Sequence, residues 1–210
     1  MFLGHLAVGL AAKRAAPSVS LATWFAAVLF VDLLWPLFLL AGIEHVRIAP
    51  GITAFTPLDF YDYPITHSLI GTLGWAMLFA SAWMAVRGRR KAGVVLAGAV
   101  VSHWVLDVIA HRPDMPVLPT GPYVGLGLWN SVPATLFVEL TMFAAGLALY
   151  LRARGARPRR VSFWLLVAFL LVAYFGASFG PPPPDTRTLA WSALALWLLV
   201  PWAAWADRDH

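Results

Sequence analysis

Residues 92–109 read AGVVLAGAVVSHWVLDVI, an apolar run that carries one histidine and one aspartate, His103 and Asp107. As a helix rising about 1.5 Å per residue, this run is about 27 Å long, close to the hydrocarbon thickness of a bilayer at about 30 Å. Basic residues stand immediately before it, as they do at the ends of membrane helices. The run therefore predicts a membrane-spanning helix with two ionisable side chains inside it.

Other runs of similar length and apolarity lie on both sides of this one. The opening residues 1–12 are apolar but too short to cross a bilayer, so they predict either a half-inserted or an interfacial helix. Residues 188–206 contain Pro201 but are long enough to span. The sequence thus predicts an all-α fold, a polytopic transmembrane helix bundle of about five to six spans plus a short N-terminal helix, as a single membrane domain over residues 1–210. The remaining predicted spans are residues 21–42, 64–86, 132–151 and 161–179.

The composition supports this prediction and excludes several other classes of protein. Hydrophobic residues make up 60% of the chain and charged residues 12%, whereas about a quarter of the residues in an average soluble domain are charged. Because the chain has no cysteine, it has neither disulfides nor thiolate metal ligands. The net charge of +5 comes from short basic clusters at the ends of apolar runs, which indicates orientation in a membrane and not nucleic-acid binding.

The distribution of basic residues predicts the topology. Clusters at residues 13–14, 87–91 and 152–160 fall on one side of the predicted spans, which leaves Arg47, Arg112 and Arg187 on the other. The positive-inside rule then places both termini in the cytoplasm of a multi-pass inner-membrane protein, with residues 43–63 and 110–131 outside. Because Lys13 follows the first apolar stretch, a signal peptide is not expected. Polar side chains of the first outer loop are expected to be solvated, namely Glu44, His45, Asp59 and Asp62.

Several ionisable side chains fall within or beside the predicted spans. Burying a charge at the centre of a bilayer costs several kcal/mol, so such residues usually face a cavity and mark a functional site. Counted from Lys91, His103 and Asp107 lie about 18 and 24 Å deep at 1.5 Å per residue. The other residues of this kind lie at comparable or somewhat different depths and are His5, Asp32, His67, His111 and Glu139.

The spacing within this set favours a metal site. His103, Asp107 and His111 follow one another at i, i+4 and i+8, which predicts one helical face. Imidazole and carboxylate together suit a divalent metal, most simply zinc, with manganese or iron as alternatives. Asp32, His67, His103 and Asp107 are the predicted ligands, and His5 and His111 are further candidates. Glu139 remains open as a ligand, a general base or a residue that orients a histidine.

At these residues the chain resembles the YdjM-like inner-membrane proteins, a bacterial family described as membrane-bound metal-dependent hydrolases. The resemblance covers residues 1 to about 140 and rests on His5, Asp32, the triplet Thr66, His67 and Ser68, and the pair His103 and Asp107. The family commonly shows His-Arg-Gly-x-Thr-His-Ser, where this chain has Asp62-Tyr63-Pro64-Ile65-Thr66-His67-Ser68. The order of these residues also resembles, more distantly, the zinc-dependent phospholipase C and nuclease superfamily. That likeness implies hydrolysis of a phosphoester.

The resulting hypothesis is a membrane-embedded, metal-dependent hydrolase acting on a phosphoester or a lipid-like substrate. Asp107 and Glu139 are its candidate catalytic carboxylates, and Arg112 or Arg47 is a candidate phosphate ligand, because guanidinium binds phosphate bidentately. Membrane lipids or small molecules are the expected partners, and nucleic acid is not. The alternatives are a metal or proton transporter that uses the same buried residues, and a noncatalytic scaffold with a structural metal.

Overall fold

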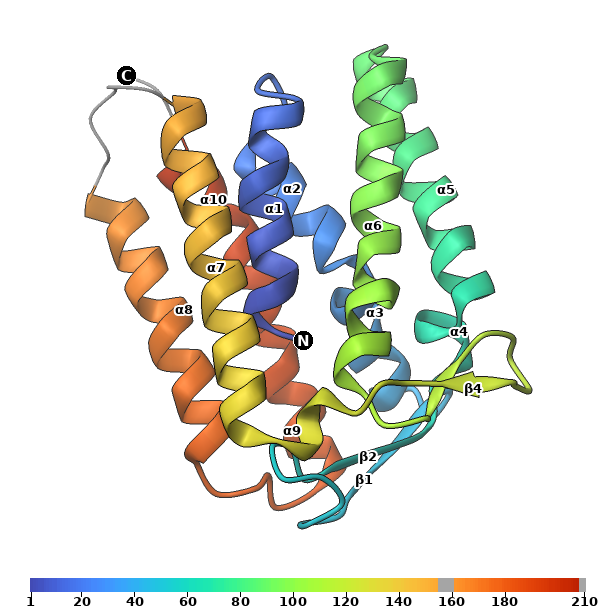
Figure 1. Cartoon of the computed structure of the whole chain (residues 1–210). Coiled ribbons are helices and arrows are strands. Elements are labelled where there is room, and N and C mark those ends of the chain that lie inside the picture. Colours follow the sequence, from blue (N-terminus) through green and yellow to red (C-terminus); the bar gives the residue numbers. More distant parts are fainter. Residues whose placement is uncertain (155–160, 208–210) are drawn as a thin grey trace.

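The fold is an all-α helix bundle, as predicted, in a computed structural model that describes residues 1–154 and 161–207 (Figure 1). Five helical segments are long and apolar enough to cross a membrane. A further pair of helices would make a sixth span. The five are α5 (Leu69–Arg87), α6 (Arg90–Ala110), α7 (Val132–Arg154), α8 (Val161–Phe179) and the segment Thr186–Ala206.

The predicted first span is broken. Residues 21–40 form α2 (Leu21–Val28) and α3 (Phe30–Leu40), which are bent by 53° at Leu29. The two helices together are still long and apolar enough to make the predicted span over residues 21–42, as a bent pair. Leu29 has φ −101° and ψ 5°, outside the helical range, and its side chain is fully buried. The bend allows the Val28 carbonyl to accept a hydrogen bond from a side chain of α6, which the site below uses.

Two other predicted spans contain local interruptions. The second begins as the short helix α4 (Pro64–His67) and resumes as α5 after Ser68, whose hydroxyl caps α5 by accepting a hydrogen bond from Gly71 N at 3.0 Å. The last span consists of α9 (Thr186–Ala193), a 3₁₀ segment (Leu194–Leu198) and α10 (Leu199–Ala206). Pro201 accounts for the 3₁₀ segment, because proline lacks the N–H that would bond to the carbonyl four residues earlier.

The N-terminal helix α1 (Leu3–Ala15) lies inside the bundle, packed against α7, α2 and α6 (Figure 1). Of the two alternatives for the opening residues, the structure has the inserted helix. Gly146 on α7 makes this packing close, because a Cβ there would lie 2.4 Å from the Ala7 carbonyl oxygen. Close approach through small residues is a usual way for membrane helices to pack. The N-terminus consequently lies part-way along the bundle, beside the polar residues of α6.

The two long loops form small hairpins at one end of the bundle (Figure 1). In the first, β1 (His45–Ile48) pairs antiparallel with β2 (Leu58–Asp62); in the second, β3 (Met115–Pro116) pairs with β4 (Tyr123–Val124). A short 3₁₀ helix, Leu128–Asn130, leads from the second hairpin to α7. The hairpins are joined by an ion pair between Asp59 and Arg112 and by a 3.0 Å hydrogen bond from Phe55 N to Trp129 O. They therefore form one cover over this end.

The opposite end holds the end of α1 and the α5–α6 turn, both rich in basic residues, as the charge pattern predicts (Figure 1). Lys13, at the end of α1, is an exception among these basic residues because it is not solvated. Its side chain is buried, and Nζ donates hydrogen bonds to Asp207 Oδ2 at 2.6 Å and to Val19 O at 2.9 Å. Three basic residues of the predicted 152–160 cluster lie outside the described residues, namely Arg157, Arg159 and Arg160.

Candidate metal centre

Ionisable side chains from four helices meet inside the bundle. Among the described residues, two groups of three could hold a metal ion, with ligand atoms within 4.8 Å of one another. One group is His5, His103 and Asp107, and the other is Asp32, His67 and His103. His103 belongs to both groups, so the two form one continuous cluster. Five of the six predicted metal ligands are thus brought together.

The tautomer of His103 follows from its hydrogen bond to the bent helix. Its Nδ1 lies 2.7 Å from the Val28 carbonyl oxygen, which can only accept, so Nδ1 carries the proton. In the neutral ring Nε2 then has a free lone pair. Nε2 lies 3.1 Å from Asp107 Oδ2 and 3.5 Å from Asp32 Oδ1, yet it makes no hydrogen bond of acceptable geometry within the described chain.

His67 is oriented in the same way, through a side chain. Glu44 accepts the Thr66 hydroxyl proton at 2.6 Å, so the Thr66 oxygen is left to accept from Nδ1 of His67 at 2.7 Å. Nε2 of His67 therefore also presents a lone pair, 3.3 Å from Asp32 Oδ1. Metal-bound histidines are usually held by such a bond from the other ring nitrogen to a neighbouring oxygen.

Glu44 departs from its expected place in a solvated loop. Its side chain is 1% exposed and also accepts hydrogen bonds from Ile65 N and Thr66 N at 2.7 and 2.8 Å. It thus holds the start of α4 and, through Thr66, the ring of His67. Asp59 is buried as well, whereas His45 and Asp62 are exposed as expected and pair with each other at 2.7 Å.

These tautomers provide a test of whether the residues fit a divalent cation. The Nε2 atoms of His67 and His103 and the Asp32 carboxylate are all acceptors. Asp32 Oδ1 lies 3.3 Å from the Nε2 atom of His67 and 3.5 Å from that of His103. Three acceptors at such distances repel unless a cation, either a metal ion or extra protons on the rings, lies among them. Two neutral imidazoles and a carboxylate form a donor set suited to zinc. Asp32, His67 and His103 therefore fit a divalent cation such as zinc.

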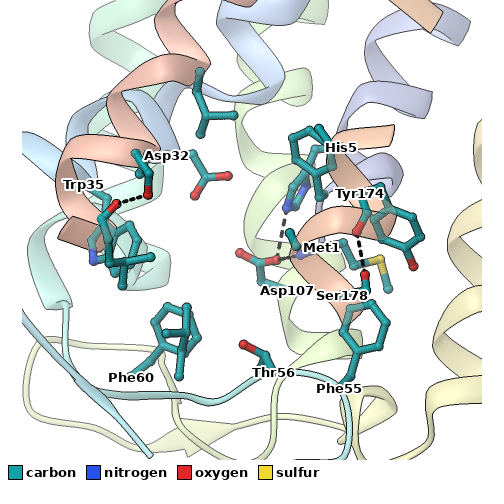
Figure 2. A pocket seen from close by; sticks show the side chains of 18 of the residues that line it. Met1, His5, Asp32, Trp35, Phe55, Thr56, Phe60, Asp107, Tyr174 and Ser178 are labelled. Carbon is teal, nitrogen blue, oxygen red and sulfur yellow. Dashed lines mark hydrogen bonds and ion pairs between the residues drawn. The ribbon is translucent and has the colours of Figure 1, made fainter. Parts of the chain in front are cut away.

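His5 and Asp107 complete the cluster from the other side. The rings of His5 and His103 stack with centroids 3.7 Å apart, and His5 Nε2 lies 3.1 Å from Asp107 Oδ1. The same carboxylate oxygen lies 2.5 Å from the Met1 amine. Figure 2 shows Asp107 between His5 and Met1 on one wall of a cavity, with Asp32 on the facing wall.

Glu139 is not part of either ligand group among the described residues, but it lies next to them. Its Oε2 accepts hydrogen bonds from Phe2 N at 3.0 Å and Gly4 N at 3.2 Å, so it caps the start of α1. The side chain is 1% exposed to the outside and lines the same cavity as Asp107. The structure thus gives Glu139 a positioning contact that the sequence does not indicate.

His111 does not continue the helical face of His103 and Asp107. α6 ends at Ala110, and His111 has the extended angles φ −69° and ψ 151°, so the predicted i+8 position is wrong. Its Nδ1 lies 3.0 Å from Asp114 Oδ1, and its ring packs on Trp129. Burial lowers the pKa of His111 below its ordinary value, against the opposing effect of Asp114. His111 lies in the cavity wall, apart from both ligand groups.

Arg112, the predicted phosphate ligand, is held by carboxylates. Its guanidinium pairs with Asp59 and, through Nε at 3.0 Å, with Asp114 Oδ2. Arg47 also pairs with Asp59, at 2.9 Å, and its guanidinium lies 4.3 Å from the Tyr61 ring centroid. These charges hold the two hairpins together, and neither arginine lines the cavity.

A cavity of about 550 Å³ opens beside the cluster. Its polar wall includes His5, Asp32, His67 and Asp107, and the hairpin cover supplies aromatic side chains such as Phe55 and Phe60 (Figure 2). The Asp32 side chain is 25% exposed, whereas those of the three histidines are 1–6% exposed. The cluster is therefore reached from the cavity on the Asp32 side. A volume of this size is typical of small-molecule sites.

Comparison with known proteins identifies no relative. No family model, no curated protein and no solved structure matches the chain. The interpretation of the cluster consequently rests on its geometry.

Proposed function

We propose that the protein is a membrane-embedded, metal-dependent hydrolase whose ion is held by Asp32, His67 and His103, with Asp107 and His5 beside them. The observation that carries the proposal is the orientation of the two histidines. Both Nδ1–H groups are bound elsewhere, to Val28 O and to the Thr66 hydroxyl, so both Nε2 atoms face Asp32. Zinc is the favoured ion, because the donors are imidazole nitrogen and carboxylate oxygen.

A divalent ion in this site would supply Lewis acidity and lower the pKa of a bound water toward neutrality. A neighbouring side chain would then accept the proton of the attacking water and later return it. Glu139 lines the same cavity and would accept a proton from the attacking water. The water oxygen bonds to phosphorus, the ester P–O bond breaks, and Glu139 returns the proton to the leaving alcohol. Asp107, which accepts from the Met1 amine and lies beside His5 and His103, would add a second carboxylate next to the ion.

The transport alternative needs a polar route on both sides of the cluster. Toward the basic end of the bundle, the core beside the cluster includes apolar side chains that are at most 1% exposed, namely Leu6, Leu10, Trp24, Leu96 and Val100. The cavity, in contrast, lies on the hairpin side. A site reached from one side suits catalysis better than passage of an ion.

The resemblance to the YdjM-like family supports the same proposal. Its residues His5, Asp32, Thr66, His67, His103 and Asp107 are those that meet at the cluster or hold it. We therefore propose membership of that family, and hydrolysis of a phosphoester or lipid-like substrate, as the best interpretation.

Substituting Glu139→Gln tests the proposed chemistry. A glutamine carbonyl can still accept the bonds from Phe2 N and Gly4 N, so α1 stays in place, but it cannot take a proton at neutral pH. We expect bound metal to remain near wild-type levels and metal-dependent phosphodiesterase turnover to fall by a factor of roughly 100 to 10,000. Turnover should be followed as alcohol released, not as uptake. Full turnover in this variant would exclude Glu139 as the base.

We further propose an inner-membrane location with cytoplasmic termini, since the basic turns gather at one end of the bundle and the hairpins at the other. Because the chain has no cysteine, single introduced cysteines report one site each. Asp62→Cys, in the exposed end of β2, should react with an impermeant maleimide added outside intact cells, and Arg89→Cys should react only after lysis. The reverse pattern would overturn this orientation.

A further inference from the structure

The cavity extends well beyond the polar cluster, into a slot between the last two spans. One wall of this slot is a face of α8, with Phe169, Ala173 and Ala177 at i, i+4 and i+8. The facing wall comes from α9 and the 3₁₀ segment after it, and includes Ser192 and Ala195. Small side chains on both walls leave the space between the helices open. The cavity thus has one ionisable end and one long apolar end.

The apolar end reaches the outer surface of the bundle. Phe169 is 45% exposed, and Ala177, Ser192 and Ala195 are also exposed, although all four line the cavity. These residues belong to segments that are apolar enough to cross a membrane, so this surface faces lipid chains. The end toward the loops is covered by the hairpins, whose Thr56 and Phe60 line it. The slot is therefore open sideways, toward the bilayer.

Polar atoms without partners lie in the wall of this cavity. Within the described chain, the Tyr174 hydroxyl and the indole N–H groups of Trp35 and Trp129 are buried without a hydrogen-bond partner. All three side chains line the cavity, and Trp35 and Tyr174 lie on opposite sides of it (Figure 2). Buried donors usually have partners, so these point to a ligand that offers oxygen acceptors. Phosphate and ester oxygens of a lipid headgroup are such acceptors.

We infer that the substrate is a lipid of the surrounding bilayer, which enters sideways between α8 and α9. Its headgroup lies among Trp35, Trp129 and Tyr174 beside the His/Asp cluster, and one of its chains lies in the slot. That the lipid is hydrolysed rests on the proposed function, but binding of its chain in the slot does not depend on that function. The apolar lining of the slot suits a hydrocarbon chain, and its opening faces the lipid phase that contains such chains.

Ala177→Trp should close the slot at its rim. Val172→Trp is the matched control, because Val172 is on the same helix, is 71% exposed and does not line the cavity. The probe is a phosphatidylglycerol with a diazirine near the glycerol end of one acyl chain, diluted into phosphatidylcholine vesicles that contain the protein. Light should attach the probe to Tyr174 and Leu199, which line the cavity but are each only 2% exposed. Ala177→Trp should remove these adducts, and Val172→Trp should keep them.

Turnover separates this inference from the proposed function. Two p-nitrophenyl phosphodiesters serve as substrates, one with a hexadecyl and one with a methyl group. Ala177→Trp should lower turnover of the hexadecyl ester by at least about tenfold, since excluding even two methylenes has roughly that effect, and leave the methyl ester unchanged. Adducts on lipid-facing residues alone, or equal loss with both esters, would overturn the slot. Adducts at Tyr174 and Leu199 without turnover of either ester would instead leave the slot standing and count against the hydrolase.

Discussion

Replacing His103 by alanine is expected to reduce bound metal to background and to lower metal-dependent hydrolysis by about 100-fold or more. His103 is the residue shared by both ligand groups, so its loss removes a ligand from each of them. Changing a residue that merely orients a ligand costs about 10- to 100-fold in affinity or activity, and losing the ligand itself should cost at least as much. Metal content and product release should therefore fall together.

The same substitution also removes one of the two imidazoles beside each of the carboxylates of Asp32 and Asp107, which keep only His67 and His5 respectively. Breaking a buried ionic contact in this way typically costs about 3–5 kcal/mol, so thermal unfolding must be measured beside activity. His103→Gln keeps the volume and serves as the milder variant. His45→Ala is the control, because the His45 side chain is exposed and forms its ion pair with Asp62, away from the cluster. A folded His103→Gln protein with wild-type metal and turnover would contradict the assignment. His210, a second candidate control, lies outside the described residues.

Thr66→Val is expected to weaken metal binding by about 10- to 100-fold without removing any ligand. The hydroxyl accepts Nδ1–H of His67 and donates to Glu44, and valine can do neither although it has nearly the same shape. The His67 ring then loses the bond that fixes its tautomer. Leaving the buried Glu44 and His67 atoms short of a partner should also lower the free energy of unfolding by about 1–3 kcal/mol. Competition with a chromogenic zinc chelator measures the affinity directly.

Thr66→Ser distinguishes orientation of the histidine from packing. Serine restores the hydroxyl but lacks the methyl group, so it should recover most of the affinity that Thr66→Val loses. Thr72→Val provides a matched control, since Thr72 is also buried but its hydroxyl bonds to a backbone carbonyl, Thr66 O. Equal affinities for the Thr66 valine and serine variants would show that the hydroxyl does not orient a ligand.

Sequence alone predicted the bundle and most of the cluster, for the same physical reason. A polar side chain in a long apolar run is costly unless other polar groups meet it, so Asp32, His67, His103 and Asp107 were expected together. His5 was a weaker candidate, because its helix is too short to span. The structure brings it in by inserting α1 into the bundle, where Gly146 admits the backbone at Ala7.

The parts that sequence did not predict depend on local backbone geometry. The sequence of residues 21–42 does not predict a bend at Leu29, because the residues on both sides of it are apolar and compatible with a helix. For Glu44, a loop residue outside any apolar run, the sequence predicts exposure to solvent. Its burial depends on the β1–β2 hairpin folding back over the start of α4, a contact between residues about twenty apart in sequence. The sequence feature that could indicate this support of the His67 ring is Thr66, a hydroxyl-bearing residue directly before His67.

The remaining differences concern residues at the cavity wall. The helical spacing extended to His111 only if α6 continued past Ala110, and it does not. Arg112 is well placed in sequence for a phosphate, but Asp59, which is 53 residues away, takes one side of its guanidinium. Glu139 was left with three roles, and its contacts with Phe2 N and Gly4 N add a fourth, support of α1.

The metal content of the purified protein tests the central claim most directly. Wild type and an Asp32→Ala, His103→Ala double variant should be purified in the same zinc-supplemented buffer and analysed by inductively coupled plasma mass spectrometry. We expect close to a stoichiometric divalent metal, most simply zinc, in wild type and background in the folded double variant, because two of the three ligands Asp32, His67 and His103 are gone. The same trace metal in both proteins would show that the His/Asp cluster does not hold a metal ion.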